Sequence, residues 1–222
     1  MNVINEFIHV AEITCPMLLQ GLGITIAVSV LSIVIALVLG MILSYVCLFK
    51  IKAASKAARI FIKIFRCTPF MVQVYIAYYG LPAIGINVNA FWTGVIILGL
   101  YTAAYVSVIL ESGYNAVPIG QYESAFAGGM GRFQMMKRII MPQALRVVIP
   151  SLTGQLIQTV KDSSILSIIT VAEMTMMTKE AIGITFSPLF VYVCAAVFYW
   201  ALNLIIEFTS KRIEKRCNRA EL

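Results

Sequence analysis

The chain has 222 residues, of which 60% are hydrophobic and only 12% are charged. Soluble domains average about 25% charged residues, so this composition excludes an ordinary soluble protein and indicates an integral membrane protein. The formal net charge of +7 therefore reports on membrane topology and does not indicate nucleic-acid binding.

Long uncharged stretches predict the membrane-spanning helices, because a span needs about 20 apolar residues. Residues 1–16 read as an amphipathic lead-in to the first span, whose Gly21, Gly23 and Gly40 offer close helix contacts. The five predicted spans are residues 17–49, 57–81, 90–112, 143–165 and 187–208. The fold class is thus all-α, with a single polytopic transmembrane domain over residues 1–222.

The basic residues predict how these spans are oriented. Of seventeen Lys and Arg residues, six follow the first span, four lie in or just after segment 117–142, and five lie in the carboxyl-terminal tail. With five spans, these fifteen residues fall on one side of the membrane. The positive-inside rule then places the amino terminus outside, and it places segment 117–142 and the carboxyl terminus in the cytoplasm.

Several kinds of site are not expected. The first dozen residues contain Glu6 and Glu12 but no Lys or Arg, so they lack the basic start of a secretory signal peptide. The glycines of residues 128–131 are not followed by Lys and Ser or Thr, so no Walker A phosphate loop is present. The five cysteines show no CxxC spacing, and neither a disulfide framework nor a metal site is expected.

Polar side chains inside the predicted spans mark a candidate substrate pathway, because such groups usually face a partner or a water-filled cavity. Gln73 lies in the second span, and Tyr101, Thr102 and Tyr105 offer hydroxyls in the third. Hydrogen bonding between helices is the alternative role for these hydroxyls. For Arg66, at the start of the second span, the alternative is a side chain that reaches out to the membrane interface.

Segment 121–142 is the longest water-compatible stretch of the chain. Pro118 sits where a first helical residue would, and Glu123 follows in the expected first turn, where the helix dipole favours an anion. Five apolar residues recur at roughly helical spacing and predict one apolar stripe, namely Tyr122, Phe126, Met130, Phe133 and Ile140. The pattern predicts two short amphipathic helices with a glycine elbow at Gly129, closed by Pro142.

The sequence Lys161-Asp162-Ser163-Ser164 is expected to interrupt the fourth span with two opposite charges. Broken helices present backbone groups and dipoles to charged substrates in many transporters. An amino acid carries a carboxylate and an ammonium, so Lys161, Asp162 and Ser163 are candidate pathway residues. The alternative is an ion pair at the outer membrane surface, since Lys161 lies late in the span. Residues 171–185 are expected to form a short polar helix.

These segments together resemble the permease subunits of bacterial ABC importers for polar amino acids. Glu123-Ser124-Ala125, then Gly129, then Ile140-Met141-Pro142 is similar to that family's signature loop, which reads Glu-Ala-Ala, three residues, Gly, and later Ile-x-Leu-Pro. Ser124 and Met141 are mild departures from it. Phe65-Arg66-Cys67-Thr68-Pro69 resembles the family's Phe-Arg-Gly-Thr-Pro segment, with Cys67 in place of the glycine.

The resemblance implies the five-helix fold of type I ABC importer permeases, with segment 117–142 as a cytoplasmic coupling-helix loop. Within that loop it assigns coupling to the ATPase to Glu123, Ser124, Ala125, Gly129 and Pro142. The implied partners are cytoplasmic ATPase subunits that use ATP and Mg, and a second permease subunit in a homodimer or a heterodimer. An extracellular or periplasmic amino-acid-binding protein and the lipid membrane complete the set. The chain itself is expected to bind no cofactor.

The function expected from the resemblance is import of polar amino acids across a bacterial cell membrane by alternating access, with ATP hydrolysis in a separate subunit. The alternative is a self-contained amino acid carrier driven by an ion gradient. Only Asp162 and the end-placed Glu111 and Glu207 offer such a carrier acidic groups for a proton relay. No inverted repeat of the kind common in carriers is visible.

Overall fold

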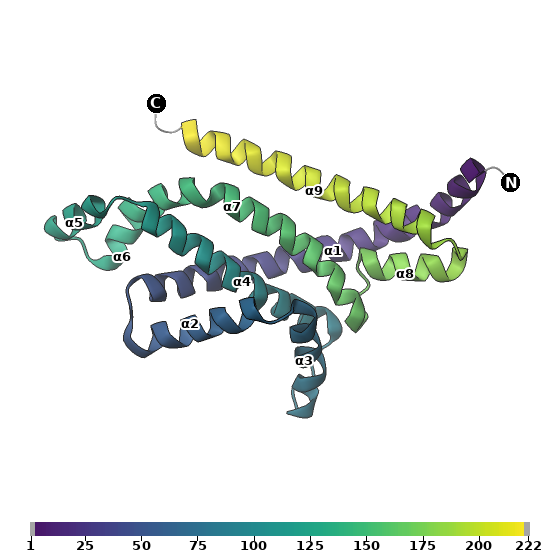
Figure 1. Cartoon of the computed structure of the whole chain (residues 1–222), viewed down its shortest axis with the longest axis horizontal. Coiled ribbons are helices and arrows are strands. Elements are labelled where there is room, and N and C mark those ends of the chain that lie inside the picture. The colour runs from purple at the N-terminus through teal and green to yellow at the C-terminus, as the bar shows by residue number, and fades with distance from the viewer. Residues whose placement is uncertain (1–2, 220–222) are drawn as a thin grey trace.

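The computed structural model describes residues 3–219, with side chains for residues 6–212 and Glu214. In this range the chain is helical, without a strand (Figure 1). The elements are α1 (Val3–Leu48), α2 (Lys52–Cys67), α3 (Phe70–Ala83), α4 (Ala90–Ala116), α5 (Ile119–Ala127), α6 (Arg132–Met135), the π-helical turn η1 (Met136–Ile140), α7 (Met141–Asp162), the 3-10 segment η2 (Ser163–Ile169), α8 (Met174–Thr185) and α9 (Pro188–Arg219). The all-α fold class is confirmed. The side chains of Lys215, Arg216 and Arg219, part of the charge count, lie outside the described set.

Among the described residues, three helices are long and apolar enough to cross a membrane, namely Glu6–Leu48 within α1, the whole of α4, and Pro188–Arg212 within α9. The pair α2 and α3 qualifies only if the two helices count as one broken span. The expected lead-in, residues 1–16, is not a separate element where it is described, because α1 is one helix of 46 residues that includes Pro16.

The predicted second span, residues 57–81, is not one continuous helix. The axes of α2 and α3 meet at an angle of 109°. Pro69 disfavours the helical conformation for the residue before it, and Thr68 accordingly lies in extended backbone with φ of −115° and ψ of 146°. The Phe-Arg-Cys-Thr-Pro segment therefore marks a bend, and α3 projects sideways from the long helices (Figure 1).

The expected interruption after Lys161 is confirmed. α7 ends at Asp162, and residues Ser163–Ile169 continue as a 3-10 helix. Thr170 then adopts φ of 63°, which turns the chain into the short helix α8. The short helix expected in residues 171–185 is therefore present.

Close packing of α1 against α4 forms the centre of the molecule. A Cβ atom at Gly40 would lie 2.6 Å from a methyl carbon of Val106, so only glycine permits this approach. The Ser32 hydroxyl donates to the Val95 carbonyl at 3.0 Å and joins the same two helices. Gly23, which was expected to make a close helix contact, faces open space, and that prediction is wrong.

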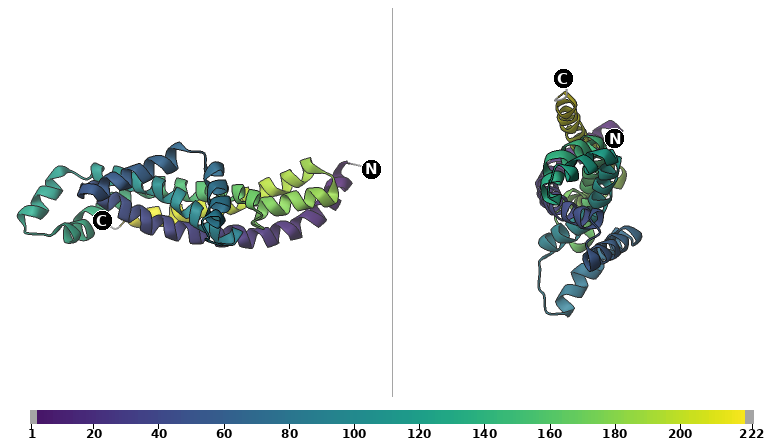
Figure 2. Two further views of the ribbon diagram at one scale, coloured as in Figure 1. Left: turned by 90° about the horizontal axis from the view of Figure 1, so that it is seen from below. Right: turned by 90° about the vertical axis from the view of Figure 1, so that its left-hand side faces the viewer.

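The molecule is elongated, and its two ends differ in the elements they contain (Figures 1 and 2). One end holds α5, α6 and the turn between α1 and α2, and the carboxyl terminus lies towards it. The other end holds the amino terminus, with α8 beside the first half of α1 (Figure 2). Most of the basic segments counted in the sequence thus lie towards one end.

Candidate coupling loop and substrate pathway

The glycine elbow of the loop is a helix-terminating motif that explains the spacing of the signature residues. Gly129 has φ of 75°, in the left-handed region that favours glycine. Its amide donates to the Phe126 carbonyl at 3.0 Å, and the Met130 amide donates to the Ala125 carbonyl at 3.0 Å. This pair of bonds is a Schellman motif, which commonly brings the residues at Ala125 and Met130 into apolar contact. The elbow expected at Gly129 is therefore confirmed.

The prediction that the loop carries one continuous apolar stripe is wrong. Ile140 is fully buried, and the Tyr122 hydroxyl donates to the Tyr114 carbonyl at 2.8 Å, so both side chains pack inward. Burial raises the pKa of the Tyr122 hydroxyl, and the neighbouring Tyr114 adds to this shift. Phe126 and Phe133, by contrast, are 51% and 72% exposed. The elbow and the π-helical turn change the helical phase between Phe126, Phe133 and Ile140. Tyr122 and Phe126 share α5 and differ because the Tyr122 hydroxyl bonds to the end of α4.

Glu123 lies in the second turn of α5, so its expected place in the first turn is wrong. Pro118 is the N-cap, and the helical residues begin one position later. The influence of the helix dipole falls off within the first turn, so it contributes little at Glu123. Glu123 and Ser124 are exposed next to Phe126, whereas Ala125 is buried in the elbow.

Pro142 does not close the loop, because the helix runs on from α6 through η1 into α7. A proline has no amide proton, and its ring clashes with the carbonyl four residues earlier in an α-helix. The π-helical turn relieves this conflict, since the Met141 amide bonds to the Met136 carbonyl five residues earlier. The Gln143 side-chain amide donates to the Ile139 carbonyl at 3.0 Å. Pro142 thus marks the junction between the loop and α7.

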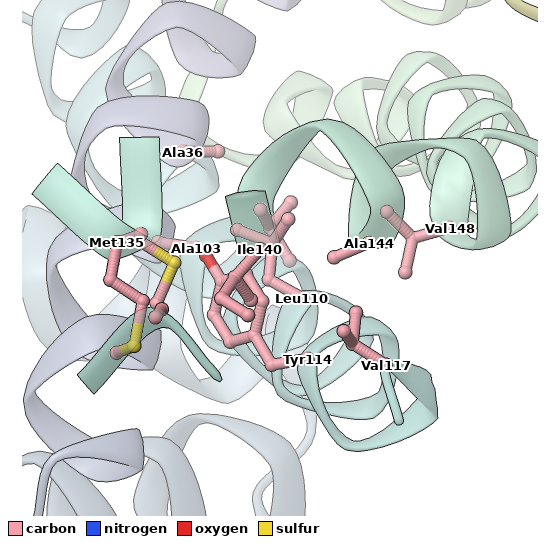
Figure 3. Packing of buried hydrophobic residues seen from close by; sticks show 12 residues of the cluster. Ala36, Ala103, Leu110, Tyr114, Val117, Met135, Ile140, Ala144 and Val148 are labelled. Atoms are coloured by element: carbon pink, nitrogen blue, oxygen red, sulfur yellow. The ribbon is translucent and has the colours of Figure 1, made fainter. Parts of the chain in front are cut away.

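A buried apolar cluster ties the loop to the long helices (Figure 3). Met135 comes from α6 and Ile140 from η1, and they pack with Tyr114 of α4, Ala144 of α7 and Ala36 of α1. Interiors packed in this way transmit displacements because they hold few voids. A movement of the loop is therefore expected to move α4 and α7.

Gln73, the first candidate pathway residue, has its amide engaged at the bend between α2 and α3. The side-chain nitrogen donates to the Phe65 carbonyl at 2.9 Å, and to the carbonyl and hydroxyl of Thr68 at 3.1 and 2.7 Å. These bonds satisfy carbonyls at the carboxyl end of α2. The Gln73 side-chain oxygen is buried and has no partner among the described residues.

Three side chains from two helices meet along one side of α4. The Arg66 guanidinium lies 5.3 Å from the centre of the Tyr105 ring. The Tyr101 hydroxyl donates to the Tyr105 hydroxyl at 3.4 Å. At the end of α7, one Asp162 oxygen accepts from Gln158 at 2.8 Å, while the other is buried without a partner among the described residues. A cation thus lies beside a pair of phenols, and a carboxylate with an open acceptor ends the neighbouring helix α7.

The other three candidates have different neighbours. The Thr102 and Thr159 hydroxyl oxygens lie 3.2 Å apart and join α4 to α7, which is the helix-to-helix role left open above. The buried Ser163 hydroxyl donates to the Val160 carbonyl at 2.8 Å. Lys161 is exposed and lines a pocket of about 450 Å³ between α7 and α9. The structure therefore joins Tyr101 to Tyr105 and Arg66, and it gives Thr102, Ser163 and Lys161 other neighbours.

Sequence reasoning missed Glu173, a fully buried carboxylate at the start of α8. It accepts hydrogen bonds at 2.8 Å from the amides of Thr175 and Met176 and from the Tyr199 hydroxyl of α9. The Met174 amide next to it donates to the Thr25 hydroxyl of α1 at 3.1 Å. The sequence signal for Glu173 was that it is the one charged residue between Asp162 and Lys179.

The sequence is similar to those of known transport-system permease proteins. The family model described as "binding-protein-dependent transport system inner membrane component" matches residues 33–219. The arginine transport system permease protein ArtQ of Bacillus subtilis is 35% identical over 90% of this chain and 92% of its own length. A putative glutamine transport system permease protein GlnP of Rickettsia felis is 36% identical over the same shares. The octopine transport system permease protein OccM of Rhizobium radiobacter is 35% identical over 85% of this chain and 81% of its own length.

Solved structures give the same result. The crystal structure of an amino acid ABC transporter with histidines contains a chain that superposes with a TM-score of 0.83 and 30% identity, covering 91% of this chain and 94% of that one. The MetNI methionine ABC transporter, in its inward-facing form, shares the fold with a TM-score of 0.73 at 20% identity, covering 90% of this chain and 96% of that one. The family match favours an importer permease over the ion-gradient carrier. The chain belongs to the family of binding-protein-dependent transport system inner membrane components, the permease subunits of ABC importers.

Proposed function

We propose that this permease carries a polar amino acid, or a closely related compound, into a bacterial cell. The proposal is supported by relatives named for arginine, glutamine and octopine, and by an amino acid transporter structure at 30% identity. Those three compounds share a carboxylate and an amine and differ in side chain and net charge. The shared groups define the proposed substrate class.

The observation that carries the proposal is the contact of Arg66 with the Tyr105 and Tyr101 pair, together with the open acceptor on Asp162. A substrate carboxylate pairs well with a guanidinium, and an ammonium pairs well with a carboxylate that has a free acceptor. The buried second oxygen of Asp162 offers such an acceptor. The phenols supply hydroxyls and ring faces. In this proposal Tyr101 and Asp162 contact the substrate. Gln73, Thr102 and Ser163 hold the helices around the pathway through the hydrogen bonds described above, and Lys161 lies outside it, between α7 and α9.

The proposed orientation has the amino terminus outside and the loop and carboxyl terminus in the cytoplasm. The split of basic residues supports it. A membrane-impermeant thiol reagent added outside cells should label a cysteine at Asn87 and spare one at Gln134, in a background without native cysteines. Asn87 is the position chosen because the Asn89 side chain caps α4 by accepting a hydrogen bond from the Trp92 amide and should stay intact. Labelling at Gln134 from outside would contradict this orientation.

The proposed mechanism is alternating access driven by partner subunits. Two cytoplasmic ATPase subunits hold ATP and Mg and hydrolyse the nucleotide, while this chain binds neither and has no enzymatic activity. Their closure moves the loop, and the buried cluster at Tyr114 and Ile140 passes that movement to α4 and α7. A second permease subunit completes the pathway, and an external binding protein delivers the substrate. Each step requires that the partner bind one conformation more tightly than the other.

Transport by purified protein in vesicles tests the function. The chain is reconstituted with its ATPase and second permease subunit, the binding protein is added outside, and uptake of radiolabelled amino acids is measured with and without internal ATP. Uptake that persists without ATP on an ion gradient would refute the importer mechanism.

Asp162→Asn tests the substrate site. It should reduce uptake by at least about tenfold at unchanged assembly, because a lost charge pair at a buried site costs a few kcal/mol. The control Glu180→Gln neutralises an exposed carboxylate and should leave uptake unchanged. Normal uptake kinetics in a well-assembled Asp162→Asn protein would remove this residue from the site.

A further inference from the structure

α2 carries five basic residues on one face. They follow each other at intervals of three and four residues, which keeps them within a narrow arc of the helix surface. The members of this basic stripe are Lys52, Lys56, Arg59, Lys63 and Arg66. All five side chains are exposed. A loop that merely obeyed the positive-inside rule would need no such alignment.

The basic stripe faces an open groove of about 800 Å³ between α2 and α4. Lys50 adds a sixth cation to its lining, and Glu111 is the one carboxylate among the described residues that line it. Glu111 pairs with Arg59 at 3.3 Å. No ion pair joins Lys56 or Lys63 to a described residue, so the groove keeps a strong excess of positive charge.

Apolar side chains lie next to these cations on the same helix. Ile60 and Ile64 are 52% and 54% exposed, and Ile60 also lines the groove. The third face of α2 is already occupied, since Ala58 and Ile62 pack against α1 and α4. The exposed surface of α2 therefore combines a cationic arc with an adjoining apolar arc.

We propose that this groove binds an anionic phospholipid, with the phosphate head group on Lys56 and Lys63 of the basic stripe and an acyl chain along Ile60 and Ile64. The chain is an inner membrane component, so phospholipid surrounds it at high local concentration. Basic pockets between helices near a membrane surface bind anionic head groups. A small soluble anion would use only the cationic arc, whereas a phospholipid satisfies both arcs at once. The lipid then covers charges and apolar side chains that the chain itself leaves open.

The test counts bound lipids on the purified transporter complex. The complex is exposed to mixed micelles of dioleoylphosphatidylglycerol and dioleoylphosphatidylcholine in equal amounts, and retained lipids are identified by native mass spectrometry. The stripe variant is Lys56→Gln with Lys63→Gln, which leaves the Arg59–Glu111 pair intact. The matched control is Lys211→Gln with Arg212→Gln, two exposed basic residues of α9. Sodium phosphate is added as a competitor in a separate arm to detect a site for free phosphate.

Wild type and control should retain phosphatidylglycerol in preference to phosphatidylcholine. The stripe variant should lose that preference by roughly 25-fold, because each of the two basic residues that it removes contributes roughly a fivefold gain in binding near an anionic surface. Equal retention by the stripe variant, or no preference in the wild type, would overturn the proposal. Displacement by millimolar phosphate would also overturn it, in favour of a small-anion site.

Loss of the ATPase or of the second permease subunit at unchanged lipid counts would instead assign the stripe to a protein partner. Lipid counts do not depend on ATP-driven uptake, so this result is independent of the proposed transport function.

Discussion

The two ends of this permease differ in how far their side chains are packed within the chain. At the amino-terminal end, the joint of α1, α8 and α9 is closed, and the buried Glu173 carboxylate accepts three hydrogen bonds. A Cβ at Gly21 would lie 2.8 Å from the Met174 backbone, so α1 and α8 touch directly there. At the other end, Gly129 of the coupling loop faces open space, and Phe126 and Phe133 are exposed.

We infer from this difference that the joint is completed within the chain, whereas the loop is the candidate surface for the ATPase. A buried carboxylate with three hydrogen bonds rigidifies its surroundings. Exposed aromatic side chains on a loop that is fixed from behind are the usual composition of a protein interface. Changes at the joint should therefore affect folding, and changes at the loop should affect coupling.

Glu173→Ala should have the largest effect, and it should fall on stability. The substitution removes the acceptor of two part-buried α8 amides, at about 1–3 kcal/mol for each unsatisfied group, and one of the two partners of the Tyr199 hydroxyl, which keeps the Thr175 hydroxyl. The midpoint of thermal unfolding of the detergent-solubilised chain should fall by roughly 5–10 °C. Glu173→Gln keeps one acceptor oxygen, so its unfolding midpoint should lie between those of the wild type and Glu173→Ala. Glu180→Ala, on the exposed side of the same helix, is the control, and an equal loss there would show that the joint is not special.

Gly129→Val should have the next largest effect, on coupling. A β-branched residue at φ of 75° is strained by roughly 1–2 kcal/mol, although no atom lies within 4 Å of the added Cβ. The elbow should open and misplace Phe126 relative to Phe133, while the buried cluster behind them keeps the chain folded. Co-purification of the ATPase and its substrate-stimulated turnover should both fall.

Gly131→Val is the matched control for this elbow. Gly131 also faces open space, but its φ of −66° and ψ of 155° suit any residue. It should retain the ATPase and the stimulated turnover. If both valine variants behave alike, the effect does not come from the left-handed backbone of the elbow.

Local chemistry explains which parts of the two ends could be predicted. The elbow followed from the Gly-Gly sequence because a left-handed position selects glycine directly. The break after Lys161 followed from charges in an apolar segment. In contrast, the bend at Thr68-Pro69 was hidden in an uncharged run, where a span and a broken span have the same composition. The π-helical turn before Pro142 was equally invisible, since a proline can either end a helix or be accommodated within one by a local change of hydrogen bonding.

Glu173 shows a second limit of the sequence. Its role depends on Tyr199 and Thr25, which lie in two other helices, and a sequence without homologues gives no contact between them. The division of the apolar stripe has a similar cause. Tyr122 packs inward because the Tyr114 carbonyl accepts its hydroxyl proton, and this carbonyl belongs to the end of α4. Helical periodicity alone treats Tyr122 and Phe126 alike.

Phe133→Ala should weaken ATPase binding without changing stability. The side chain is 72% exposed, so its removal creates no cavity in the isolated chain. At an interface, an aromatic side chain of this kind commonly contributes on the order of 2 kcal/mol, or a thirtyfold change in affinity. Affinity is measured by titrating the ATPase against immobilised permease. Phe208→Ala, a similarly exposed residue of α9 at 63%, is the control. A loss of thermal stability in Phe133→Ala would mean that the residue supports the loop itself.

Glu123→Lys should have the smallest effect, and it distinguishes a contact with the partner from support of the loop helix. Glu123 lies in the second turn of α5, where the helix dipole has little influence. The unfolding midpoint should therefore stay within error of the wild type. If the carboxylate pairs with a cation on the ATPase, the exposed pair is worth about 0.2–1 kcal/mol, so affinity should fall by no more than about fivefold.

Salt concentration separates the two explanations for such a change. Screening reduces the interaction between exposed charges, so the difference between wild type and Glu123→Lys should shrink between 50 mM and 500 mM salt. Glu123→Gln should lose about half as much affinity, and Glu180→Lys, which reverses a charge at the opposite end, should lose none. An affinity loss that persists at high salt, or a lowered unfolding midpoint, would place Glu123 among the residues that hold α5 together. The loop would then resemble the joint at Glu173 more closely than its exposed surface indicates.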